Sequence, residues 1–271
     1  MQDLGNTRNR VGRRKEKYKK MMNQMPKAGV LVSQPVLFIR SFIFYVGFYV
    51  SIFFHSAVCV IVCPLLSVKR RFAFVTLVTR FITWWLRITC KINVNVKGYE
   101  NIITDQTYIV MCNHQSAWET LFLQTLFSPL STVLKEELMR IPLFGWALRF
   151  LKPIAIDRDQ RFKSLKKLIS QGKDRLEEGI SVLIFPEGTF FSKVVPGEYL
   201  KGSAALSSSS RYPVLPVVHN AGEHWPPDKL LKIPGTIQIV IGPAINSENH
   251  SIDEIQKKAV SWINEAVKKI D

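Results

Sequence analysis

His114 and Glu119 are the residues of this 271-residue chain whose types and spacing point most directly to chemistry. They lie in MCNHQSAWETLFL, residues 111–123, where an apolar strand is predicted to run into a helix. A histidine beside a carboxylate can act as a general base, while the carboxylate orients the imidazole ring. Positions five apart on one helix are about 140° out of phase. The pair can therefore form only if His114 lies in the loop before the helix.

Ser116 and Glu119 also fit a purely structural interpretation. Ser-x-x-Glu is the spacing of a capping box, in which the two side chains satisfy N–H groups at the start of a helix. Backbone capping and contact with the imidazole are competing uses of one carboxylate. The histidine–acid spacing alone has little specificity, so both uses of Glu119 stay open at this point.

The elements that would position these residues begin after Cys90, where strand and helix patterns alternate. Strands are predicted at 91–98, 107–112, 132–135, 153–158, 181–189, 212–220 and 236–243. Helices are predicted at about 117–126, 161–178 and 251–270, with a short helix or turn at 141–151. The serine run 207–210 is expected to be a loop at a helix end. This alternation predicts an α/β sheet, in which functional residues lie beyond the carboxyl ends of strands.

Three further charged residues follow predicted strands. Glu187 lies in the stretch FPEGT, and Lys135 and Arg158 each end another strand. FPEGT also has the composition of a turn, and Lys135 and Arg158 taken singly are typical surface charges. His219 and His224 could suggest a metal site, but the sequence offers no evident third ligand. We therefore predict no metal.

The segment from Pro35 to Leu66 is the most apolar part of the chain. Within it, the 26 residues 41–66 carry no charge apart from a possible one on His55, which exceeds the ~20 residues that cross a bilayer core. Residues 72–88 are apolar but contain two arginines, which favours an interfacial helix. Basic residues flank both sides of the apolar run, so a helical hairpin with both ends in the cytoplasm would satisfy the positive-inside rule.

The formal net charge of +16 calls for an anionic partner, such as nucleic acid, a membrane surface or a phosphorylated substrate. Residues 1–27 hold nine Lys or Arg against two acids and are expected to be disordered. We predict a basic tail at 1–34, a membrane anchor at 35–90 and a domain with the candidate residues at 91–271. Nucleic acid is not the expected partner, because no nucleic-acid motif is recognised and the polar candidates follow strands instead of forming an aromatic platform.

Four motifs occur in an order typical of one family. NHQSAWET is followed by IDR, FPEGT and PVLPVVHN, within about residues 95–245. This series resembles that of the glycerolipid acyltransferases, and within them most closely the bacterial 1-acylglycerol-3-phosphate acyltransferases. The resemblance implies a mixed α/β sheet flanked by helices, with an N-terminal membrane helix or helical hairpin. It also implies a place in the inner (cytoplasmic) membrane, with the catalytic domain facing the cytoplasm.

The same resemblance implies transfer of an acyl group from acyl-CoA or acyl carrier protein to the sn-2 hydroxyl of lysophosphatidic acid, giving phosphatidic acid. His114 would be the base and Glu119 its orienting acid. The expected substrate-binding residues are Lys135, Arg158, Glu187, Gly188 and Thr189. A thioester is already an activated donor, so no metal or other cofactor is expected. The implied partners are membrane lipids and the two substrates.

Two positions depart from the family pattern. Glu119 stands where Asp is usual, which lengthens the arm by about 1.5 Å. Phe190 stands where Arg commonly follows FPEGT, so another cation, with Arg158 the foremost candidate, would have to meet an anionic acceptor. The alternatives are an acyltransferase of the same series that acts on glycerol-3-phosphate or another lyso-lipid, and a catalytically inactive membrane scaffold.

Overall fold

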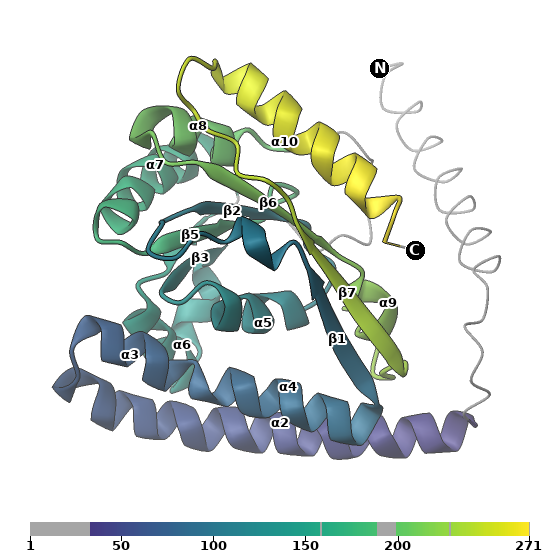
Figure 1. Cartoon of the computed structure of the whole chain (residues 1–271). Coiled ribbons are helices and arrows are strands. Elements are labelled where there is room, and N and C mark those ends of the chain that lie inside the picture. The colour runs from purple at the N-terminus through teal and green to yellow at the C-terminus, as the bar shows by residue number, and fades with distance from the viewer. Residues whose placement is uncertain (1–32, 158, 189–198, 228, 271) are drawn as a thin grey trace, which may run out of the picture. The chain divides into compact units, whose positions relative to one another are not determined.

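Among the residues that the structure describes, seven strands form one mixed sheet in the order β1-β7-β6-β2-β5-β3-β4, which confirms the predicted fold class (Figure 1). The strands from β6 to β4 in this order are parallel, while β7 is antiparallel to β6 and parallel to β1. The strands are β1 (Ile92–Lys97), β2 (Ile109–Cys112), β3 (Leu130–Lys135), β4 (Ile154–Ile156), β5 (Ser181–Ile184), β6 (Val214–His219) and β7 (Gly235–Ile241). Because β2 lies between β5 and β6, the carboxyl ends of these three strands meet at one edge.

The computed structural model describes residues 33–157, 159–188, 199–227 and 229–270. Arg158, Thr189 and Phe190 lie outside the described residues, as does most of the basic tail. Residues 37–271 belong to one compact unit.

Helices cover both faces of the sheet (Figure 1). The alternation of β2 shows why: Val110 and Cys112 point into a core shared with α2, α4 and α5, whereas Ile109 and Met111 point into a core shared with α7, α8 and α10. The helices are α2 (Gln34–Val62), α3 (Val68–Val75), α4 (Leu77–Cys90), α5 (Trp118–Leu126), α6 (Phe144–Leu148), α7 (Arg161–Glu177), α8 (Gly202–Ser210), α9 (Ala221–His224) and α10 (Ile252–Val267).

The serine run 207–210 is helical, so the prediction of a loop there is wrong. The hydroxyls of Ser209 and Ser210 donate to the carbonyl of Leu206 at 3.0 and 2.7 Å. A serine that donates to the preceding turn is satisfied inside a helix. The weak helix propensity of serine is then overridden by the packing of α8 against the sheet, and the helix ends at Arg211 in the left-handed conformation.

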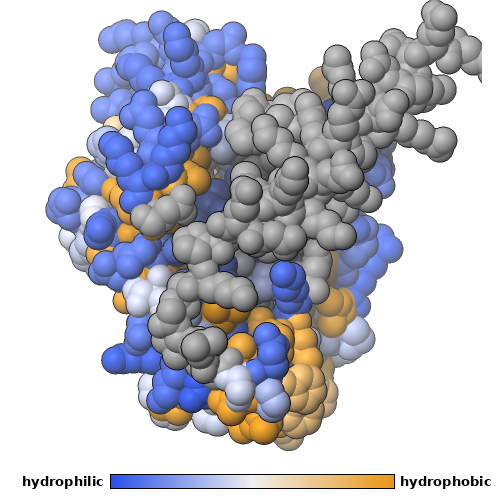
Figure 2. All heavy atoms as spheres, turned by 90° about the vertical axis from the view of Figure 1, so that its right-hand side faces the viewer, coloured by the Kyte–Doolittle hydropathy of each residue, from blue (hydrophilic) through white to orange (hydrophobic). Residues whose placement is uncertain are grey.

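Two apolar helical segments, residues 34–65 and 68–90, are long and apolar enough to cross a membrane. Helix α2 leaves large side chains exposed, among them Phe42, Phe53 and Phe54. Figure 2 shows hydrophobic residues gathered at the lower end of the view, the level at which Figure 1 draws α2 and α4. By length and composition, the two helices suggest membrane association.

Lys232 links α2 to the loop between α9 and β7. Its backbone N–H donates to Ser41 Oγ at 2.8 Å, and its Nζ donates to Tyr45 Oη at 2.7 Å, both on α2. The ammonium also donates to two carbonyl oxygens of its own loop at 3.2 Å, and it lies over the rings of Tyr45 and Trp225. Burial lowers the pKa of Lys232 to about 8, so the group keeps its charge at pH 7. The oxygens and rings compensate for burying that charge.

Replacing Lys232 by Met is expected to lower the melting temperature of the detergent-solubilised protein. Methionine fills the volume of the lysine stem but removes the donor to the Tyr45 hydroxyl and to two carbonyl oxygens of the loop, a loss of about 1–3 kcal/mol. The matched control is Lys229→Met, an exposed lysine of the same loop, expected to change stability by less than about 0.5 kcal/mol. Equal melting temperatures for the two variants would show that the ammonium does not hold α2 in place.

Candidate active site

The candidate residues gather where the carboxyl ends of β2, β5 and β6 meet. Asn113 and His114 follow β2, Phe185 and Glu187 follow β5, and His219 ends β6. Each lies at or within three residues of the end of a strand that is buried on both faces. The chain therefore carries polar groups into a largely buried corner as soon as the strands end.

His114 and Glu119 form the predicted pair. His114 lies in the loop before α5, as pairing requires, and Glu119 is in the first turn of that helix. His114 Nδ1 is 2.7 Å from Glu119 Oε1, and the side chains are 7% and 0% exposed. The ring of Phe185 stacks on the imidazole with 4.0 Å between centroids and 19° between planes. The imidazole is thus fixed at one edge by a carboxylate and on one face by an aromatic ring.

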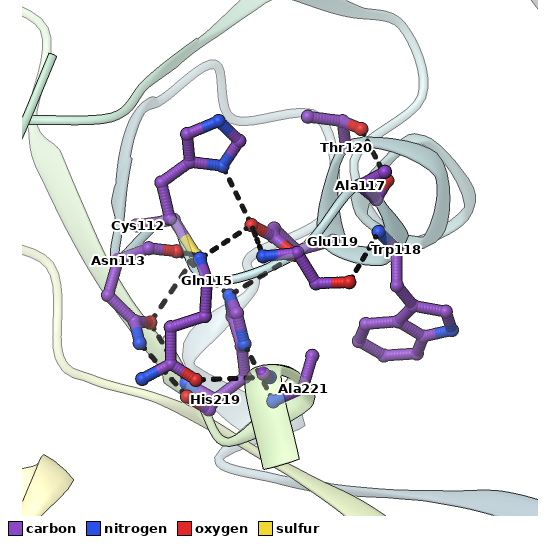
Figure 3. A network of polar contacts seen from close by, with 12 residues as sticks. Cys112, Asn113, Gln115, Ala117, Trp118, Glu119, Thr120, His219 and Ala221 are labelled. Carbon is purple, nitrogen blue, oxygen red and sulfur yellow. Dashed lines mark hydrogen bonds and ion pairs between the residues drawn. The ribbon is translucent and has the colours of Figure 1, made fainter. Parts of the chain in front are cut away.

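The backbone uses the same carboxylate oxygen. Glu119 Oε1 accepts the N–H groups of Gln115 and Ser116, each at 2.9 Å. Ser116 Oγ accepts from the backbone N–H of Trp118 at 3.1 Å, so the serine half of a capping box is shifted by one residue. Figure 3 shows Glu119 at the centre of this network. Capping and contact with the imidazole are therefore made together by one oxygen.

Glu187 is a second buried carboxyl group, 8% exposed. Burial raises its pKa to about 8, the nearby Glu119 carboxylate adds to the rise, and the backbone N–H groups of Glu187 and His114 oppose it. Neither carboxyl oxygen makes a hydrogen bond of good geometry to the described residues. Gly188 follows with φ +70°, a left-handed conformation that turns the chain beside the site. Glu187 is therefore largely protonated at neutral pH and can donate a hydrogen bond.

The other predicted substrate-binding residues are not all described. Lys135 ends β3 and forms a 2.7 Å ion pair with Glu137, both about half exposed. Arg158 and Thr189 lie outside the described residues. The structure thus brings His114 and Glu119 together, with Glu187 and Gly188 beside them.

Comparisons with known proteins agree with this architecture. A family model described as "Acyltransferase" matches residues 93–220. The chain is 42% identical over 236 residues to the 1-acyl-sn-glycerol-3-phosphate acyltransferase of Pseudomonas aeruginosa, covering 86% of this chain and 91% of that protein. It is 27% identical to the Saccharomyces cerevisiae protein of the same name, over 61% of this chain and 54% of that one. The chain belongs to the acyltransferase family.

The crystal structure of the 1-acyl-sn-glycerophosphate (LPA) acyltransferase PlsC from Thermotoga maritima matches with a TM-score of 0.71. That match covers 86% of this chain and 95% of the other at 24% identity, and it bears on the fold alone. The agreement extends the likeness from the motif region to the helices that surround it.

The acyltransferase has a polar contact at this corner that the sequence did not predict, between Asn113 and His219. The Asn113 amide donates to the carbonyl of His219 at 2.9 Å and accepts its backbone N–H at 3.0 Å. The sequence suggests His219 only as a metal ligand together with His224, but His224 Nδ1 lies 3.0 Å from the carbonyl of Ile233. Within the described ranges, no three His, Cys, Asp or Glu side chains cluster to hold a metal ion. The available signal was a histidine at the end of an otherwise apolar strand.

The melting temperature of the wild type is expected to fall between about pH 5 and pH 8, and to fall less in Glu187→Gln. Folding raises the pKa of Glu187 from 4.5 to about 8, so the folded state holds a proton that the unfolded chain releases. The stabilisation is complete below about pH 4 and is lost as the pH rises through about 8. At about 1.36 kcal/mol per unit, the shift sets an upper limit of roughly 5 kcal/mol. Thermal unfolding of both proteins in one detergent, across this pH range, makes the comparison, and parallel curves would contradict a protonated Glu187.

Proposed function

We propose that this acyltransferase transfers a fatty acyl group from acyl-CoA or acyl carrier protein to the sn-2 hydroxyl of lysophosphatidic acid, forming phosphatidic acid. The observation that carries the proposal is the 2.7 Å pair of His114 and Glu119 at the carboxyl edge of the sheet. It occurs in a chain that is 42% identical to a P. aeruginosa protein named for this reaction.

His114 acts as the general base in this proposal. With its Nδ1–H donated to Glu119, the neutral ring carries its lone pair on Nε2. Nε2 takes the proton of the sn-2 hydroxyl while the oxygen attacks the thioester carbonyl carbon. The C–S bond then breaks, and the leaving thiolate receives the proton back from the imidazolium. Glu119 stabilises the imidazolium between the two transfers.

Glu187 and Gly188 bind the acceptor in this proposal. A protonated carboxyl group can donate to an ester or hydroxyl oxygen of the glycerol, which an ionised one cannot. This role is supported by the raised pKa of Glu187 and by the lack of a well-formed hydrogen bond from its oxygens to the described residues. The phosphate is assigned to Arg158, with Lys135 and Thr189 in support, because an arginine can bind phosphate through two parallel hydrogen bonds.

The acceptor is a lipid, and the N-terminal helices suit that substrate. We propose a basic tail at 1–34, an anchor at 35–90 in the inner membrane and a catalytic domain at 91–271 that faces the cytoplasm. The exposed apolar side chains of α2 support the anchor, and the thioester donor is water-soluble and reaches the site from the cytoplasmic side. No metal or other cofactor enters this mechanism.

His114→Ala is expected to lower kcat by about 10²–10⁴, the usual contribution of a general base, without moving the protein out of the membrane fraction. The companion variant is Glu119→Gln, whose amide oxygen can still accept the N–H groups of Gln115 and Ser116. A loss of activity in that variant therefore reports the contribution of the negative charge of Glu119, and not that of its hydrogen bonds to the start of the helix. If His114→Ala keeps activity within tenfold of wild type, or Glu119→Gln keeps all of it, the assigned roles fail.

The acceptor is identified by offering the purified protein lysophosphatidic acid, glycerol-3-phosphate, a zwitterionic lyso-lipid and monoacylglycerol, each with acyl-CoA and with acyl carrier protein. We expect the highest kcat/KM with lysophosphatidic acid and a product acylated at sn-2. A higher kcat/KM on glycerol-3-phosphate or another lyso-lipid would select the alternative acceptor class. Phe190 in place of arginine would then mark an enzyme for that class of acceptor.

A further inference from the structure

We infer that His219 is a positioning residue of the reaction, because it faces the one oxygen of Glu119 that does not hold His114. Glu119 Oε2 is buried and has no hydrogen bond to any described residue. His219 Nε2 lies 3.9 Å from it. The inference rests on the proposed function only in that His114 is the base and Glu119 its partner.

Hydrogen bonds determine which nitrogen of His219 carries the proton. The backbone N–H of Ala221 donates to His219 Nδ1 at 3.1 Å, so Nδ1 must be an acceptor. The proton of the neutral ring is therefore on Nε2, which donates to the carbonyl of Asn113 at 2.8 Å. Burial lowers the pKa of His219, although the nearby Glu119 carboxylate opposes this, and the ring remains a neutral donor.

The ring is held so that this N–H cannot turn away. Its backbone is clamped by the Asn113 amide on both the N–H and the carbonyl, and the side chain is only 1% exposed. Asn113 directly precedes His114, so the carbonyl that accepts the His219 hydrogen bond belongs to the residue next to the candidate base. Figure 3 shows His219 and Asn113 beside Glu119, with Ala221 on the far side of the imidazole.

Such an N–H matters because Glu119 must stay in one orientation while charge develops on His114. The terminal torsion of a glutamate is broad, and fixing one oxygen alone leaves the other free to swing. Hydrogen bonds fix Oε1, whereas Oε2 has His219 Nε2 at 3.9 Å. At this distance the contact between His219 Nε2 and Glu119 Oε2 is longer than a hydrogen bond. In this inference His219 restricts the movement of Oε2, and the distance shortens when His114 becomes an imidazolium.

Two substitutions separate this role from simple stabilisation. In His219→Gln the amide nitrogen takes the place of Nε2 and keeps a donor toward Asn113 and Glu119, but the acceptor for Ala221 is lost. In His219→Asn an oxygen at the place of Nδ1 keeps that acceptor, but the side chain no longer reaches Glu119. Each variant loses one buried hydrogen bond, so their melting temperatures should fall by similar amounts.

The kinetic parameters are measured on whichever acceptor of the panel gives the highest turnover, so a wrong substrate assignment does not affect the comparison. We expect His219→Asn to lower kcat about 10- to 100-fold with KM within about threefold, the size of one lost hydrogen bond to a charged group. His219→Gln should keep kcat within about threefold of wild type. His224→Asn, in the adjacent helix α9, is the control and should leave kcat unchanged.

Equal losses of kcat in the two His219 variants, or a full kcat in His219→Asn, would overturn the inference. A second measurement uses the unsubstituted protein labelled with ¹⁵N-histidine, with His219 assigned by the signals missing from His219→Gln. A neutral ring protonated on Nε2 between pH 6 and 8 is expected. An imidazolium, or a ring protonated on Nδ1, would refute the inference even if His219→Asn does not fold.

Discussion

The burial of the Glu119 carboxylate is the constraint on which the rest of the site depends. A carboxylate with no exposed surface is costly unless donors surround it. Here Oε1 receives the imidazole and two backbone N–H groups. The chain can supply these only by leaving β2, turning within residues 113–117 and starting α5 at once. The connection between β2 and α5 therefore has to be short in order to bring these donors to the carboxylate.

The two buried carboxyl groups of the site have opposite environments. Oε1 of Glu119 faces three donors, whereas neither oxygen of Glu187 makes a hydrogen bond of good geometry to the described residues, and burial raises the pKa of Glu187 to about 8. Environments that differ in this way let one corner hold a carboxylate that binds the His114 imidazole and a carboxylic acid that can donate. Their proximity reinforces the difference, because the charge of Glu119 helps to keep Glu187 neutral.

The corner is also connected to the apolar N-terminal helices. The backbone pairing of β2 with β6 ends at Cys112 and Val217. Beyond it, the Asn113 side chain makes hydrogen bonds to the backbone N–H and carbonyl of His219, in place of a further backbone pair. The chain then passes through α9 to Trp225, which packs edge-on against Phe44 of α2 at 5.0 Å between centroids. Lys232 fixes the same loop to α2. The segment from α9 to Lys232 therefore connects the end of β6 with α2, the helix that carries the exposed apolar side chains.

Local sequence was sufficient for the α/β alternation, the strands and several of the helices, and it marked His114 and Glu119 as a candidate pair without deciding between pairing and capping. Strand periodicity, helix spacing and a five-residue separation are properties of neighbouring residues, so they can be interpreted without knowing the fold. The helical serine run could not be predicted, because its hydroxyls are satisfied by a helix that packing stabilises. The partnership of Asn113 and His219 could not be predicted either, because the two residues are 106 positions apart and become neighbours only when β6 pairs with β2. The shared use of one Glu119 oxygen by cap and imidazole, and the protonation of Glu187, were likewise decided by the tertiary structure, since both depend on burial and on donor directions that no local pattern encodes.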